Sequence, residues 1–212
     1  MARKVLTRAE SQAQTRAQLL DSAEQMFYTK GYHATSIAAI AAEAGRTIGA
    51  VYSNFESKEA LCLEVLKNRY ISELTRLLEA MMPAGDSLDA RFEALSSWWL
   101  TLSTETPLIL LTAEYIISTF YDEDQSAANR EVIERVKDSA RVLLEDTVPE
   151  PISKTDPRMN DALDAVISTA IGLALARPMG VIDAERGAEL MVTNLRMWFE
   201  RLSQKPEEAA TS

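Results

Sequence analysis

The sequence has very little of the reactive chemistry on which most enzymes depend. It contains one cysteine, Cys62, and one histidine, His33, among 212 residues. A single cysteine excludes an internal disulfide and fits a reducing compartment. The Glu-x-x-His pattern of di-iron bundles is missing, and so are a P-loop and a dinucleotide-binding fingerprint. We therefore expect a protein that is not an enzyme and has no cofactor or metal, with Cys62 as a small buried side chain.

Glycine, proline and long apolar runs are also scarce. Seven Gly and seven Pro leave room for long helices. The most apolar stretches, Leu108–Phe120 and Ala162–Val181, both contain charged residues, and we expect neither to span a membrane. No apolar stretch follows the basic Met1–Thr7, so we expect no secretory signal. These patterns predict a cytoplasmic protein without a membrane partner.

The net charge of −10 and the pI near 4.7 argue, taken alone, against a nucleic-acid partner. The distribution of charge changes that interpretation. Residues 1–60 carry seven Lys/Arg and six Asp/Glu, whereas the remainder carries 15 and 26. A nearly neutral head attached to an acidic body indicates that the two parts have different functions.

Hydrophobic residues recur at helical spacing through most of the chain, and no period-2 pattern is convincing. The sequence therefore predicts an all-α fold of about nine helices. We expect the helices at 14–30, from 35, from 47, 57–82, 88–102, 107–121, 132–144, 158–177 and 183–202. The predicted domains are a DNA-binding head (1–60), a ligand-binding and dimerisation body (61–205) and a disordered tail (206–212).

Several helix boundaries can be predicted from capping chemistry. Gly31 and Gly45 are placed to end the first and second helices. Hydroxyl and carboxylate side chains that can cap a following helix are Thr35, Thr47, Ser57, Asp86 or Ser87, and Asp183. Asp122-Glu123-Asp124 is expected to break the sixth helix, and Val148–Pro157, with three prolines, is expected to be a loop.

The most informative segment is Thr35 to Lys58, TSIAAIAAEAGRTIGAVYSNFESK, which predicts two short helices joined by a glycine-containing corner. This is the pattern of a helix-turn-helix, whose second helix enters the major groove. Gly49 and Ala50 would let that backbone approach the duplex closely. Ile48 and Val51 are expected to anchor the helix, although Ile48 could touch a thymine methyl group.

The segment resembles the DNA-binding head of the tetracycline-repressor family over approximately residues 15–65. The resemblance is carried by Phe27, Gly31, Thr35, Ile40-Ala41, Ala44-Gly45, Gly49, Tyr52, Phe55, Lys58 and Leu61. It implies that Thr35, Tyr52 and Lys58 contact phosphates. It also implies that the bases are faced by Arg46, Thr47, Gly49, Ala50 and Ser53, although Ser53-Asn54 stand where the family often has a larger aromatic or basic residue.

Simpler interpretations of these residues stay open. Tyr52 could belong to the core, Thr35 could act only as a helix cap, and Lys58 could be a solvated charge. Arg3, Lys4 and Arg8 could form an arm that enters a minor groove.

The resemblance further implies that helices five to seven enclose a small-molecule pocket and that helices eight and nine form a dimer. The expected pocket residues are Trp98, Trp99, Thr112, Glu114, Tyr115, Ser118 and Phe120, with Glu114 suited to a cationic ligand. The eighth helix is apolar on more than one side, which independently favours a second subunit. The expected dimer residues are Ile167, Ile171, Leu195 and Trp198.

These observations predict a homodimeric transcriptional regulator that binds a double-stranded DNA operator. We expect a repressor that a small, largely apolar effector releases from DNA. The alternative is a DNA-binding protein without a small-molecule effector, regulated by a protein partner.

Overall fold

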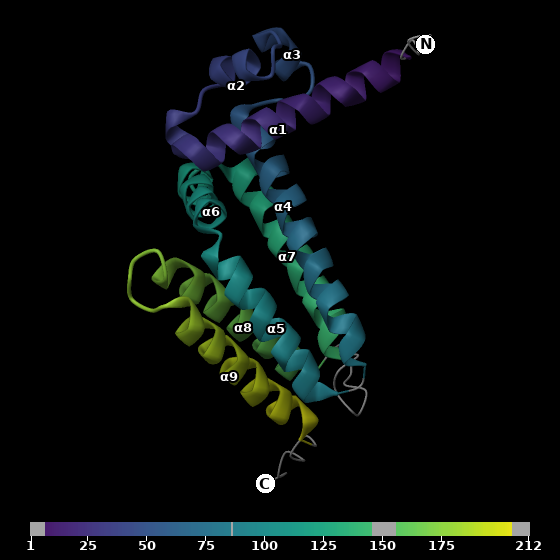
Figure 1. Ribbon diagram of the computed structural model, residues 1–212, viewed down its shortest axis with the longest axis vertical. Helices are drawn as coiled ribbons and strands as arrows, with labels where there is room; N and C mark the ends of the chain where they lie inside the picture. The colour runs from purple at the N-terminus through teal and green to yellow at the C-terminus, as the bar shows by residue number, and fades with distance from the viewer. Residues whose placement is uncertain (1–6, 86, 146–155, 205–212) are drawn as a thin grey trace. The chain divides into compact units, whose positions relative to one another are not determined.

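The computed structural model describes residues 7–85, 87–145 and 156–204, and this part of the chain is helical without a strand (Figure 1). The all-α prediction is confirmed. In chain order the helices are α1 (Arg8–Ala34), α2 (Ile37–Glu43), α3 (Ile48–Tyr52), α4 (Lys58–Met81), the 3₁₀ turn η1 (Met82–Ala84), α5 (Leu88–Thr104), α6 (Thr106–Thr119), α7 (Glu123–Glu145), α8 (Pro157–Ala176) and α9 (Ala184–Ser203).

Capping side chains begin many of these helices, as their chemistry predicts. A side-chain oxygen accepts the backbone N–H three residues on, at 3.1, 3.1, 3.3 and 2.7 Å, in Thr47, Ser57, Ser87 and Asp183. Such a bond satisfies one of the backbone donors that a helix N-terminus leaves without an intrahelical partner. These four predicted caps are confirmed.

Three boundaries differ from the prediction. Ser36, not Thr35, caps α2 by accepting the Ala39 N–H at 3.2 Å. The first helix begins at Arg8 because Thr7 and Glu10 form a reciprocal capping box. The sixth helix ends at Thr119, just before the acidic run as predicted, but α7 begins at Glu123 and not near residue 132, since Asp122 accepts the N–H of Gln125 at 3.0 Å.

Some predictions concern residues outside those described. They are the arm residues Arg3 and Lys4, the cap Asp86, most of the loop Val148–Pro157, and the tail 206–212.

The described residues form two compact units. Unit 1 consists of Met1–Ser72 with Pro107–Ala128, and unit 2 of Glu73–Thr106 with Asn129–Ser212. The expected boundary at residue 60 does not coincide with this division. The difference arises chiefly because α6 packs with the head, and because α4 and α7 contribute residues to both units.

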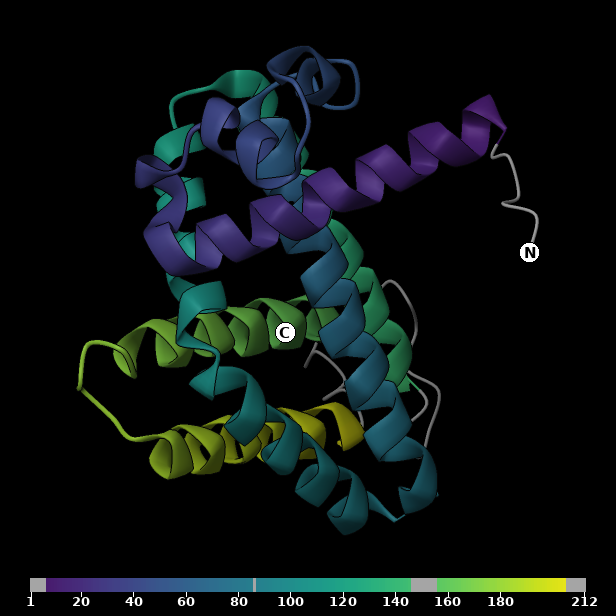
Figure 2. The ribbon, with the colours of Figure 1, turned by 45° about the horizontal axis from the view of Figure 1, so that its top comes forward.

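In unit 1, α2 and α3 lie on the same side of α1 (Figures 1 and 2). Each helix contributes fully buried side chains, so the unit has a continuous apolar interior. They include Leu19 and Phe27 of α1, Ile40 of α2, Val51 of α3, Leu61 of α4, and Leu108 and Tyr115 of α6. Cys62 is also fully buried, as expected, and its burial raises the pKa of the thiol to about 12.

Gly31 interrupts α1 and brings it against α6. Its backbone has φ 81° and ψ 171°, in a region that residues with a side chain rarely adopt. A Cβ atom at Gly31 would lie 3.0 Å from Oε2 of Glu114, and the next residue, Tyr32, donates its N–H to that oxygen at 2.6 Å. The backbone conformation therefore favours glycine, and a side chain at this position would also require the Glu114 carboxylate to shift by a few tenths of an ångström.

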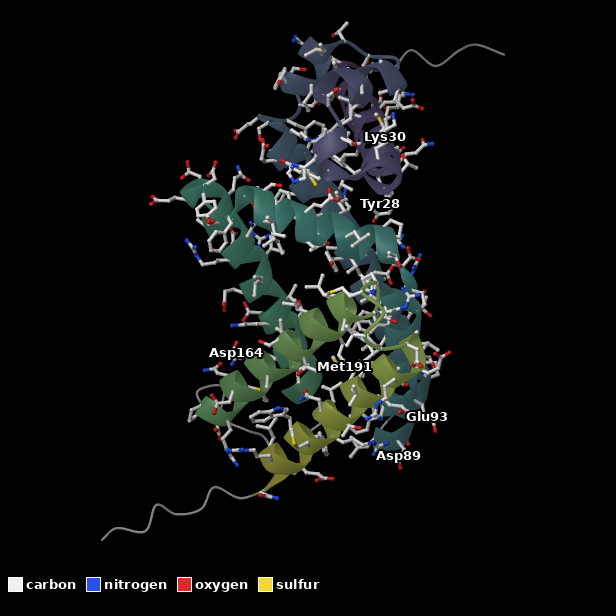
Figure 3. All side chains as sticks on the ribbon, turned by 90° about the vertical axis from the view of Figure 1, so that its left-hand side faces the viewer. Tyr28, Lys30, Asp89, Glu93, Asp164 and Met191 are labelled. Atoms are coloured by element: carbon white, nitrogen blue, oxygen red, sulfur yellow. The ribbon has the colours of Figure 1, made fainter. Side chains whose placement is uncertain are left out.

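Unit 2 contains α5, α8 and α9, which lie side by side in Figure 1, together with the end of α4 and most of α7. One core cluster contains Met159, Leu163 and Phe199, and another contains Trp99, Ala188 and Met191. Figure 3 shows Met191 on α9, whereas Asp89 and Glu93 lie one turn apart on α5 and are exposed. Asp89 accepts a hydrogen bond from Arg196 at 2.9 Å, which ties α5 to α9.

The expectation that no segment could span a membrane needs correction for α8. By length and composition α8 is apolar enough, with a mean hydropathy of 1.3, and only 17% of its apolar window is buried in this structure. Core helices of soluble proteins pass the same test, so this is weak support for a membrane segment. The firmer observation is that α8 leaves apolar surface uncovered.

We predict that Gly31→Ala destabilises the protein more than Gly45→Ala. Both substitutions force an alanine into positive φ, at 81° and 62°, which costs about 1 to 3 kcal/mol. Only Gly31 faces a carboxylate, since a Cβ at Gly45 would have nothing within 4 Å. Displacing Glu114 should add about 1 kcal/mol or more by weakening its hydrogen bond. Urea unfolding of the two variants measures the difference, and equal losses of stability would contradict the prediction.

Candidate nucleic-acid interface

The corner between α2 and α3 is set by local backbone chemistry. Gly45 adopts φ 62°, which ends α2, and the N–H of Arg46 returns to the carbonyl of Ala41 at 2.8 Å. Buried Ile40 and Val51 fix the inner faces of the two helices. The outer face of α3 and the corner before it are therefore presented to solvent.

The residues predicted to face the bases lie on that outer surface. Arg46, Thr47, Gly49 and Ser53 are exposed, and Ala50 is half-buried. The hydroxyl of Thr47 accepts the cap bond and can still donate its own hydrogen. Nothing inside the protein requires a glycine at Gly49, because an added Cβ would meet only Thr47 Oγ1, at 3.8 Å. The short third helix thus has room for close contact with a partner on this side.

Two larger side chains stand on the same surface. Ile48 is 48% exposed and Tyr52 is 56% exposed. The core alternative for Tyr52 is therefore excluded in this structure, and Val51, at 0% exposure, anchors α3 without help from Ile48. The prediction that Ile48 serves as an anchor is wrong because its side chain points out with the base-facing residues.

Thr35, in contrast, is buried. It is 1% exposed, and its hydroxyl is 2.8 Å from the Gly31 carbonyl and 3.2 Å from that of Met26. A buried hydroxyl satisfied by backbone carbonyls is not placed to meet a phosphate. The geometry thus gives no support to the phosphate role expected of Thr35, and the exposed neighbour Ser36 carries the hydroxyl at the start of α2.

Lys58, at the first position of α4, is half-buried. Its ammonium lies 4.1 Å from the centroid of the Tyr32 ring, in a cation–π contact. Partial burial lowers the pKa of Lys58 from its ordinary value. The side chain is therefore held in place by an aromatic ring, and the alternative of a solvated, unconstrained surface charge does not describe it.

The basic side chains near α3 also have defined partners. Arg46 donates from Nε and Nη2 to Oε1 of Gln18 on α1, at 3.2 and 2.6 Å. Arg16 pairs with Glu64 and lies over the Phe55 ring at 4.7 Å. Arg46 remains exposed at the corner despite its hydrogen bonds, so its guanidinium is available to an acceptor on the outside.

The residues predicted to line a ligand pocket are not gathered within either unit. Trp98 and Trp99 belong to unit 2, whereas Thr112, Glu114, Tyr115, Ser118 and Phe120 belong to unit 1. Within unit 1 the polar candidates have partners: Tyr70 with Thr112 at 3.0 Å, Tyr32 with Glu114 at 2.6 Å, Gln125 with Tyr115 at 3.2 Å, and His33 with Ser118 at 3.0 Å. Phe120 is 67% exposed.

Unit 2 offers other features that sequence reasoning missed. A groove of about 320 Å³ is lined by Glu73, Arg76, Ala80, Ala94, Ser97, Trp98 and Thr101. Among the described residues, the buried polar atoms Trp99 Nε1, Asn194 Oδ1 and Trp198 Nε1 have no hydrogen-bond partner. Buried polar atoms of this kind call for water or a ligand. Met191, Asn194 and Trp198 recur at helical spacing on α9, so the sequence could have shown that Asn194 lies on the buried face of this helix.

The residues expected at a dimer interface divide into two sets. Ile171 is 53% exposed and Ile167 is half-buried. Leu195 and Trp198 instead pack against the core clusters of unit 2. Exposed apolar side chains that the prediction did not include are Met179, Val181 and Met197, at 75, 68 and 56%.

The described residues contain no group of three or more His, Cys, Asp and Glu side chains placed to hold a metal ion.

Comparison with known proteins bears on both the head and the fold. Residues 19–65 match the model of a family described as bacterial regulatory proteins, tetR family. The chain is 40% identical over 97 residues to the HTH-type transcriptional regulator AcrR of Shigella flexneri, an alignment that covers 45% of this chain and 43% of that protein. The matched segments span less than half of the length of the curated relatives.

Solved structures extend the likeness to nearly the whole chain. A transcriptional regulator from Rhodococcus sp. RHA1 has a TM-score of 0.69 at 18% identity, over 90% of this chain and 99% of that one. The TetR-family repressor FadR of Thermus thermophilus, solved with lauroyl-CoA, has a TM-score of 0.61 at 17% identity, over 93% and 98%. At these identities the likeness concerns the fold.

Proposed function

We propose that the chain is a transcriptional regulator of the TetR family, and that it is a homodimeric repressor released from its operator by a small, largely apolar effector. The observation that carries the proposal is the solvent-facing surface of α3, within the segment that matches the family. On that surface Gly49 leaves space beside two exposed side chains, Ile48 and Tyr52. We place the protein in the cytoplasm, where it can reach DNA.

In this proposal α3 enters the major groove of the operator. Arg46, Thr47, Gly49, Ala50 and Ser53 face the bases, and Ile48 joins them as a side chain suited to a thymine methyl group. Tyr52 and Lys58 contact phosphates, and Ser36 replaces the buried Thr35. All of the residues assigned to DNA contact are exposed except Ala50 and Lys58, which are half-buried, and this supports the assignment. The head is nearly neutral and the body acidic, so the head is the part better suited to approach DNA.

We infer that a second copy of the chain covers α8 and α9. Ile171 of α8 and Met197 of α9 are each more than half exposed, and only 17% of the apolar window of α8 is buried. Exposed apolar side chains of this size favour a protein interface. A dimer would also present two copies of α3 to successive major grooves, which lie about 34 Å apart.

We propose that the effector binds in unit 2. Trp99 Nε1 is a buried donor beside an apolar cluster and Asn194 Oδ1 is a buried acceptor on α9, and a polar group of a ligand would satisfy either atom. The alternative, regulation by a protein partner without an effector, would leave these atoms to water.

We predict that Gly49→Leu weakens operator binding without destabilising the fold. The leucine has space in the isolated protein and favours a helix, but it would keep α3 from the groove. Binding is measured against salt on the protein's own upstream DNA and on random duplex. We expect at least a tenfold loss of specific affinity, with an unchanged unfolding temperature. Tyr52→Phe should lower the specific affinity a few-fold, because it removes one hydrogen bond. Wild-type affinity in Gly49→Leu would contradict entry of α3 into the groove.

We predict that Ile171→Glu combined with Met197→Glu gives a monomer in analytical ultracentrifugation. Burying the two glutamate charges in an apolar interface would cost more free energy than the remaining contacts provide. The matched control is Ile117→Glu on α6, an equally apolar residue that is 71% exposed but lies outside the proposed interface. If Ile117→Glu is a monomer while the double variant remains a dimer, the interface is on α6 and the prediction is wrong.

We predict that an effector raises the unfolding temperature of the wild type more than that of Trp99→Phe. Phenylalanine keeps the aromatic ring but removes the indole N–H, so the variant loses a hydrogen bond to the ligand. The thermal-shift screen would contain apolar compounds with one polar group, with lauroyl-CoA included because FadR is known in complex with it. If no compound stabilises the wild type, regulation by a protein partner is favoured.

A further inference from the structure

Tyr32 occupies the point in unit 1 where α1, α4 and α6 meet. Its side chain is 4% exposed. Its hydroxyl donates to Oε1 of Glu59, on α4, at 2.7 Å, and its ring meets Tyr115 of α6 edge-on at 6.0 Å. The ring also stacks at 5.9 Å on Phe27 of the same helix. One aromatic side chain therefore contacts residues of all three helices.

The backbone of Tyr32 is held by α6. Its N–H donates to Oε2 of Glu114 at 2.6 Å, and the preceding Gly31 leaves just enough room for that carboxylate. A charged acceptor makes a stronger hydrogen bond than a neutral one. A neighbouring contact, between Ser118 and His33 at 3.0 Å, joins the same two segments one turn further along α6.

The face of the Tyr32 ring supports the side chain of Lys58. The ammonium lies 4.1 Å from the ring centroid, and Lys58 stands at the first position of α4, next to Glu59. Lys58 also experiences the charges of Glu59 and Glu114. A shift of the Tyr32 backbone would therefore move the surface on which the lysine lies.

We propose that Glu114 is a positioning residue for the DNA contact of Lys58: the carboxylate holds the backbone of Tyr32, and the Tyr32 ring holds the ammonium where it meets a phosphate. The inference rests on the proposed function, since it needs Lys58 to bind the operator. It assigns Glu114 a role within unit 1 instead of one in recognising a cationic effector. Oε2 of Glu114 already accepts a hydrogen bond from the N–H of Tyr32.

The test measures how the affinity for DNA depends on salt. The probe is a duplex enriched from a random-sequence pool by the wild-type protein, with a scrambled duplex of equal length for comparison. Removing one cation from its phosphate lowers the slope of log affinity against log salt by about 0.9. Lys58→Ala should lower the slope by that amount per protomer, and Glu114→Ala should lower it equally, with a decrease in affinity of about tenfold.

The salt slope separates positioning from simple destabilisation. A variant that is only partly folded binds less DNA, but its folded fraction keeps every phosphate interaction and the wild-type slope. In the double variant Lys58→Ala with Glu114→Ala, the slope should equal that of Lys58→Ala alone. A wild-type slope in Glu114→Ala, or a further fall in the double variant, would overturn the proposal.

A conservative variant completes the design. Glu114→Gln keeps a carbonyl oxygen that can accept the Tyr32 N–H, so it should restore the wild-type slope. A slope as low as that of Glu114→Ala would assign the effect to charge and overturn the positioning role. If the wild type binds neither duplex, the proposed function fails and the inference fails with it. If the wild type binds and only the Glu114 result disagrees, the inference alone fails.

Discussion

The hydrogen bond from the Tyr32 N–H to the Glu114 carboxylate, at 2.6 Å, is the contact on which much of unit 1 depends. It joins residues 82 positions apart in the chain, and it sits beside the interruption of α1 at Gly31. The interruption turns the last part of α1 toward α2, and it sets Tyr32 against α4 and α6. Without an acceptor at this point the buried N–H would lose its partner, which proteins rarely tolerate.

Chemistry within a few residues is predictable from the sequence. Thr47, Ser57, Ser87 and Asp183 cap helices as expected because a cap needs only a short polar side chain and an N–H three residues on. Where two hydroxyls are adjacent, the prediction is wrong. Thr35 is taken into the core, where it meets carbonyls of α1, so Ser36 is left to cap α2. Burial decides between the two, and burial depends on distant parts of the chain.

The partners of α6 could not be predicted for the same reason. Polar residues within an apolar helix indicate a ligand pocket, and the sequence does not show that α1, α4 and the start of α7 supply their hydrogen bonds. Glu114, Ser118 and Tyr115 meet Tyr32, His33 and Gln125, respectively. The same limit applies to α9, where Trp198 and Leu195 recur at the spacing of an interface but pack within unit 2. Periodicity identifies an apolar face, but not what covers it.

Ile48 stands outward on α3 with no polar atom in its side chain. If it meets a base in the operator, it can recognise only an apolar group, and in the major groove that group is the methyl on carbon 5 of thymine. Cytosine methylated at carbon 5 presents a methyl group at the same place. A protein that recognises this methyl group would therefore respond to the methylation of cytosine as well as to the base sequence. Enzymatic methylation of the operator could then alter how much of it the regulator occupies.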